Sequence, residues 1–88
     1  MATTINPVPL RVFVAGVASN LRGRIEDHGW TVARVARESG IPDSTLRRHL
    51  ADGRHLSFVE IVHVLEVIGE ADPAAVMLEV CDVKAPQA

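Results

Sequence analysis

The residues Gly40, Ile41 and Pro42 constrain the fold of this chain most, because they interrupt a stretch that is otherwise helical. Glycine readily adopts the left-handed conformation that ends helices, and a residue that precedes proline avoids the helical conformation. Apolar residues recur at helical spacing on both sides of this interruption, which predicts helices over 32–39 and 43–50. Two short helices joined by a tight corner are therefore expected.

Three further helices are predicted from periodicity and capping signals. Apolar residues recur every three or four positions within 9–29, where Gly29 closes the helix. The capping box at 57–60 begins another helix, and Asp72-Pro73 begins a last one that ends near Val80. Thr31 is the expected N-cap of the helix before the corner. The fold class is thus predicted to be all-α, a compact bundle of about five helices.

The apolar residues on these helices define an expected core. Its expected members are Leu10, Phe13, Val14, Val17, Leu21, Ile25, Val32, Val35, Ala36, Leu46, Leu50, Phe58, Ile61, Val62, Leu65 and Ile68. Further apolar residues lie outside the expected core-facing sides of the helices or cluster on the last helix. We call them the surplus: Val12, Val59, Val64, Val67, Met77, Leu78 and Val80. Two interpretations stay open, a core helix with a broad apolar face or a homodimer interface through the first, fourth or last helix.

The length of 88 residues suggests a single domain. We expect a flexible arm over 1–8, a folded domain over 9–80 and a frayed tail over 81–88. The single cysteine, Cys81, excludes an internal disulfide framework. Neither a signal peptide nor a membrane-spanning apolar run is recognisable, so the expected location is the cytoplasm.

Charge is distributed unevenly along the chain. Residues 1–55 hold eight arginines and five acidic residues, a balance of +3, whereas residues 56–88 hold Lys84 and six acidic residues, a balance of −5. The sum is the net charge of −2. Contacts with phosphate depend on the local balance, so the arginine-rich part keeps nucleic acid among the candidate ligands.

The segment from Trp30 to Gly69, which includes STLRRHLADG at 44–53, resembles the helix-turn-helix domains of the phage repressor and Cro (XRE-like) type. It is most similar to versions found in actinobacterial and actinophage regulators. The resemblance places the helix-turn-helix at about 31–50, with Gly40 at the corner.

The segment departs from the family pattern at Val32, where a polar residue is common, and at Pro42, where a Ser or Thr cap is frequent. Because of Pro42, the third helix has two possible starting positions that are one residue apart. A third departure is His49, which occupies a position that is usually apolar and packed, so we expect this side chain to be partly buried.

The resemblance implies that the third helix enters the major groove while the second lies across the DNA backbone. Asp43, Ser44 and Arg48 then occupy positions that reach base edges, although Asp43 has a second possible role as a helix cap. Contacts with phosphate are implied for Thr45, Arg47, Arg34 or Arg37, and Arg54. The alternative for the arginines is a solvated surface that pairs with Glu38 and Asp52.

The function predicted from these features is a sequence-specific DNA-binding transcriptional regulator, a phage or prophage repressor of the immunity or Cro-like kind. Its expected partners are operator DNA and a second copy of the chain. The alternative is a protein-interaction module, such as an antitoxin or a polymerase adaptor. No enzyme activity, small-molecule substrate, cofactor or metal is expected, because no zinc-binding spacing is formed by His28, His49, His55, His63 and Cys81.

Overall fold

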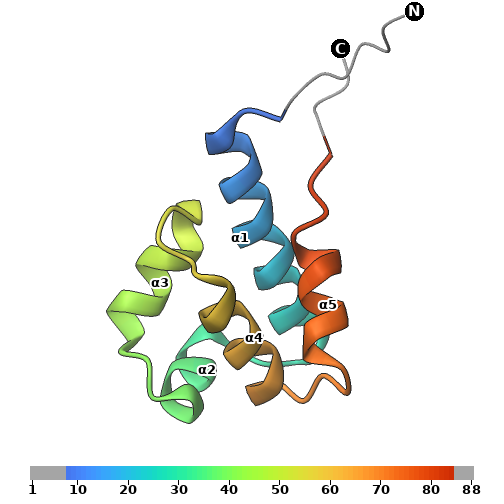
Figure 1. The fold of residues 1–88 in the computed structure, drawn as a ribbon. Coiled ribbons are helices and arrows are strands. Elements are labelled where there is room, and N and C mark those ends of the chain that lie inside the picture. Colours follow the sequence, from blue (N-terminus) through green and yellow to red (C-terminus); the bar gives the residue numbers. More distant parts are fainter. Residues whose placement is uncertain (1–7, 85–88) are drawn as a thin grey trace, which may run out of the picture.

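The computed structural model describes residues 8–84 and consists of five helices with no strand in that range. α1 packs along α3 and α4 packs along α5, while α2 contacts both α3 and α4 (Figure 1). The predicted all-α bundle is confirmed. Its helices are α1 (Leu10–Asp27), α2 (Val32–Ser39), α3 (Asp43–Asp52), α4 (Phe58–Val67) and α5 (Pro73–Val80).

The predicted caps begin three of the helices. A side-chain oxygen accepts a hydrogen bond from the backbone N–H three residues later at Thr31 (3.1 Å), Ser57 (3.1 Å) and Asp72 (3.2 Å). The capping box at Ser57 is only half formed, because the carboxylate of Glu60 binds His49 on α3 instead of returning to the helix end. A residue that the local motif assigns to a cap thus joins two helices.

The core is aliphatic and draws on every helix. Its buried hydrophobic residues are Val17, Ala18, Leu21, Ile25, Val35, Ala36, Leu46, Leu50, Ile61, Val64, Leu65, Ile68 and Val80. Most of the expected core is confirmed, and Phe13, Val32 and Ile41 pack partly against it.

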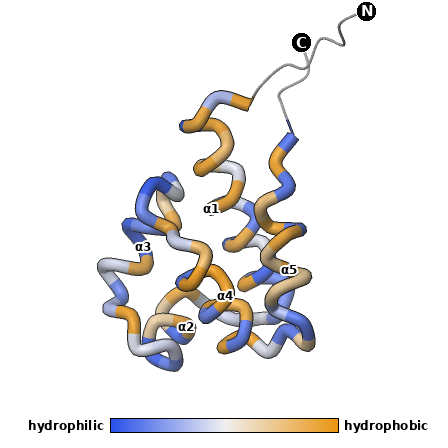
Figure 2. The backbone as a smooth tube through the Cα atoms, viewed as in Figure 1, coloured by the Kyte–Doolittle hydropathy of each residue, from blue (hydrophilic) through white to orange (hydrophobic). Residues whose placement is uncertain are grey.

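Expected and observed burial differ most at four positions, and Val14 and Val62, also expected in the core, are only half-buried. Leu10 and Phe58, expected in the core, are 77% and 66% exposed, whereas Val64 and Val80, expected in the surplus, are 0% and 1% exposed. Hydrophobic residues cover most of α4 (Figure 2), so periodicity does not select which of its sides faces inward. Leu10 is exposed because the first turns of α1 extend beyond α2, α3 and α4 (Figure 1).

The segment that follows α5 packs against the bundle. Cys81 and Val83, which lie at the start of the predicted tail, are partly buried and pack against the core. A Cβ atom added to Gly16 would lie 2.6 Å from Val83 Cγ1, which shows how closely this segment approaches α1. The rest of the expected tail, 85–88, and residues 1–7 of the expected arm lie outside the described residues.

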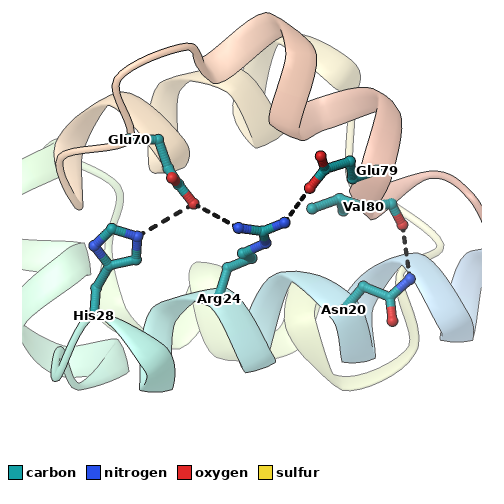
Figure 3. Close-up of polar contacts among 6 residues, drawn as sticks. All are labelled: Asn20, Arg24, His28, Glu70, Glu79 and Val80. Carbon is teal, nitrogen blue, oxygen red and sulfur yellow. Dashed lines mark hydrogen bonds and ion pairs between the residues drawn. The ribbon is translucent and has the colours of Figure 1, made fainter.

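Polar contacts join α1 to the C-terminal part of the chain (Figure 3). Arg24 on α1 binds Glu70, with Nη1 and Oε2 3.3 Å apart, and also binds Glu79 on α5. His28 Nε2 lies 3.2 Å from the same Glu70 oxygen. Asn20 Nδ2 donates a hydrogen bond to the carbonyl oxygen of Val80, at 2.9 Å. We call this set of contacts the α1–α5 seam.

The N-terminal half of α1 crosses the turn that follows α3. Gly53 lies in this turn with φ of 78°, and a Cβ atom at this position would collide with the carbonyl oxygen of Val14. Only glycine both adopts this conformation without strain and leaves room for the backbone of α1. The crossing fixes the C-terminal end of α3 against α1.

Candidate nucleic-acid interface

The corner between α2 and α3 is held by short-range hydrogen bonds. Gly40 has φ of 79°, and its N–H donates to the carbonyl oxygen of Ala36 at 3.1 Å. The hydroxyl of Ser39 donates to the same carbonyl at 3.3 Å and accepts from the N–H of Ile41 at 3.2 Å. These bonds satisfy the end of α2 and direct the chain into α3.

The start of α3 differs from those of α2, α4 and α5 because it has no side-chain cap. Pro42 occupies the N-cap position and α3 begins at Asp43, so the proline causes no shift from the predicted start. The first backbone N–H groups of α3 are therefore left to water or to a ligand. An uncapped helix start of this kind favours anions.

Most of the site residues predicted from the sequence are exposed. These residues are Arg34 and Arg37 on α2, Asp43, Ser44, Arg47 and Arg48 on α3, and Arg54 just beyond α3. Thr45, another predicted contact, is half-buried. We call the surface formed by these residues on α2 and α3 the α2–α3 face.

The structure brings some of these residues together and separates others. Arg37 and Asp43 line one shallow groove at the α2–α3 corner. Arg47 lines a second groove, beside Val32 at the start of α2. Arg54 lies apart from both, in a hollow near the start of α1. The predicted contacts thus extend along the whole length of α3.

Two arginines of the α2–α3 face have partners within the chain. Arg47 Nε donates to both carboxylate oxygens of Asp43, one turn earlier on α3, at 3.1 and 3.0 Å. The guanidinium of Arg34 lies 3.8 Å from the ring centre of Trp30, a cation–π contact. Each contact fixes the position of an arginine side chain at the surface. The carboxylate of Asp43 is paired with Arg47.

Three other arginines, Arg37, Arg48 and Arg54, form no ion pair with the side chains of residues 8–84. All 11 acidic residues of the chain lie within this range. Glu38 and Asp52, the partners considered in the alternative interpretation, bind no arginine side chain there. Asp52 instead accepts a hydrogen bond from the backbone N–H of Arg54, at 3.0 Å.

Three long-range contacts join α2 and α3, which carry the α2–α3 face, to α1 and α4. Arg22 Nη1 on α1 donates to the carbonyl oxygen of Leu50, near the end of α3. His49 is half-buried as predicted, and its Nδ1 lies 2.8 Å from Glu60 Oε1 on α4. His63 Nε2 on α4 lies 2.9 Å from the carbonyl oxygen of Ser39. Sequence reasoning missed these contacts because no local motif links residues 11 to 28 positions apart.

Within the described part of the chain, no group of three or more His, Cys, Asp and Glu residues is arranged to hold a metal ion. Burial raises the pKa of the Cys81 thiol. No helix in this part is both long and apolar enough to cross a membrane. No family model, curated protein or solved structure matches the chain.

Proposed function

We propose that the chain is a sequence-specific DNA-binding protein that regulates transcription, with α2 and α3 as its helix-turn-helix. The supporting observation is that Arg37, Arg48 and Arg54, exposed on and beside the α2–α3 face, have no carboxylate partner among the side chains of residues 8–84, where all 11 acidic residues lie. Unpaired guanidinium groups suit phosphate oxygens and the O6 and N7 atoms of guanine. A repressor of phage or prophage type, either immunity or Cro-like, is the simplest form of this function.

In this proposal α3 lies in the major groove and α2 crosses the backbone. Arg48 reads a guanine, and the small side chain of Ser44 lets α3 approach the base edges closely. Arg37 and Arg34 bind phosphates from α2. The uncapped start of α3 adds backbone N–H donors for another phosphate.

Asp43 and Arg47 act as a pair in this proposal, since each is the other's partner on the free protein. The i, i+4 contact orients Arg47 before DNA arrives and offsets part of the repulsion between Asp43 and phosphate. Asp43 does not cap α3 with its side chain, so its role within the protein is to orient Arg47. Asp43→Asn separates this role from base contact. Lost preference at one cytosine in the variant indicates base contact, whereas stronger binding to every duplex indicates that Asp43 only orients Arg47.

The experiment that tests the proposed function is selection of bound duplexes from a random DNA pool at low salt. We expect an enriched consensus with the wild-type chain and none with an Arg47→Ala/Arg48→Ala variant that circular dichroism shows to be folded. Absence of enrichment with folded wild-type protein contradicts DNA recognition and favours the protein-interaction module.

A homodimer is a second part of the proposal, supported by the exposed apolar residues. Phe58 and Val59 are neighbours at the start of α4, and with Leu78 on α5 and Leu10 on α1 they are 65–77% exposed. The proposed dimer interface would cover the pair on α4. A dimer would bind two half-sites related by symmetry, so the selected consensus would be palindromic. Sedimentation equilibrium of the wild type and of Val59→Lys tests this part, and a wild-type monomer at all concentrations excludes it.

A further inference from the structure

A hollow lies between the first turns of α1 and the turn that follows α3. It has a volume of about 360 Å³ and is lined by Leu10, Arg11, Val14, Arg54 and His55. Leu10 and Val14 provide apolar walls, while the two guanidinium groups and the imidazole provide hydrogen-bond donors. Arg11 and His55 have no role in the α2–α3 face described above.

Among the described residues, no carboxylate neutralises the charges of this hollow. Neither Arg11 nor Arg54 forms an ion pair with the side chains of residues 8–84, where all of the acidic residues lie. No carboxylate lines the hollow. The ring of His55 lies 5.9 Å from that of His49 and carries at least one N–H donor in either charge state. The hollow is thus suited to an anion.

The fold brings these residues together by a close backbone crossing. Gly53 lies directly against the backbone of Val14, which places the first turns of α1 beside Arg54 and His55. Because Arg22 also ties α1 to the carbonyl oxygen of Leu50, the hollow has a defined position relative to the end of α3. A ligand in the hollow therefore lies just beyond the C-terminal end of α3.

We propose that Arg11, Arg54 and His55 bind a DNA backbone phosphate that flanks the bases contacted by α3. This inference rests on the proposed DNA-binding function and extends the contact surface to α1. A phosphate diester fits because it is a single anion with two free oxygens, which two guanidinium groups can share. The apolar walls strengthen these contacts by excluding water from one side. The hollow contributes affinity and orientation but no base preference.

The test measures how salt weakens DNA binding by the wild type and by Arg11→Ala. Each phosphate contact contributes about −0.9 to the slope of log K against log salt concentration. Over a fourfold rise in salt, the wild-type affinity is therefore expected to fall about 3.5-fold more than that of Arg11→Ala. The consensus selected by the two proteins is expected to be the same.

Three controls identify the flanking phosphate as the cause. Arg11→Lys keeps the charge and is expected to keep the wild-type slope. Lys84→Ala removes an exposed charge that does not line the hollow, and is also expected to keep it. A duplex that ends at the consensus lacks the flanking phosphate, so wild type and Arg11→Ala are expected to bind it equally. The comparison duplex extends about one helical turn beyond the consensus on each side.

The outcomes separate this inference from the proposed function. Equal slopes for wild type and Arg11→Ala on the extended duplex, with binding still lost in Arg48→Ala, overturn the phosphate site and leave the DNA-binding function standing. A changed consensus in Arg11→Ala also overturns it, because the residue would then contact a base. Failure of the folded wild type to bind any duplex overturns both proposals.

Discussion

The α1–α5 seam contains Arg24 and the α2–α3 face contains several arginines, and the two regions use this residue type differently. In the seam, Arg24 binds two carboxylates, and His28 shares one of them (Figure 3). On and beside the α2–α3 face, Arg37, Arg48 and Arg54 have no carboxylate partner among the described residues. Arginine therefore joins helices in one region and remains available to a ligand in the other.

The difference comes from where the acidic residues lie in the folded chain. The C-terminal part supplies Glu70 and Glu79 to the seam and Glu60 to His49, and none of the three carboxylates reaches an arginine of the α2–α3 face. The net charge of −2 is a sum over the whole chain and does not indicate the local charge of either region. Local ion pairing is thus the more informative quantity for predicting a partner.

The largest expected effect concerns the core beneath the α2–α3 face. Leu46 is fully buried where α3 meets the other helices, and Leu46→Ala is expected to lower the free energy of unfolding by about 2–5 kcal/mol. Urea denaturation followed by circular dichroism measures this loss. If the variant keeps wild-type stability but loses DNA binding, Leu46 belongs to the ligand surface and the division between core and face is wrong.

The next effect tests whether unpaired arginines serve binding rather than stability. Arg48→Ala is expected to weaken binding to the selected duplex by about 1–3 kcal/mol and to relax preference at one base pair. Its free energy of unfolding should change by less than about 0.5 kcal/mol, because the side chain is exposed and unpaired. Titration of labelled consensus and single-mismatch duplexes measures the first quantity. Equal losses on all duplexes would make Arg48 a phosphate contact.

Arg24→Ala is the corresponding variant in the seam, and it is expected to lower stability while leaving DNA binding nearly unchanged. It leaves Glu70, whose side chain is only 11% exposed, without its guanidinium partner. The expected loss in the free energy of unfolding is about 1–2 kcal/mol, reduced because Arg24 is itself 34% exposed. DNA affinity at a temperature where the variant is folded should remain within about twofold of wild type. A larger loss of affinity would place the seam in the DNA-binding surface.

The smallest expected effect is a gain in stability from Gly23→Ala, also on α1 beside the seam. Nothing lies within 4 Å of a Cβ atom at Gly23, so alanine is expected to stabilise the helix by about 0.5–1 kcal/mol. Gly16→Ala is the matched control, since its Cβ atom would lie 2.6 Å from Val83. Thermal unfolding of both variants measures the difference. Equal gains would show that the segment after α5 does not pack on α1.

The sequence alone was sufficient for features that depend on neighbouring residues. The helix order, the caps at Thr31, Ser57 and Asp72 and the corner at Gly40 were predicted and are present. The caps and the corner each involve groups a few residues apart in the chain, so local conformational preference decides them. For the same reason, the outward positions on α2 and α3 followed from helical periodicity once Leu46 and Leu50 were assigned to the core.

Only the tertiary structure decided which side of α4 is buried and which arginines are neutralised. Val64 is buried while Phe58 is exposed because neighbouring helices select one side of an almost wholly apolar helix. Glu60 leaves its capping box for His49, and Arg24 meets Glu70 and Glu79 from 46 and 55 residues away. The hollow beside Arg11 likewise exists only where α1 crosses the turn at Gly53. Such contacts depend on helix packing, and no local pattern in the chain specifies them.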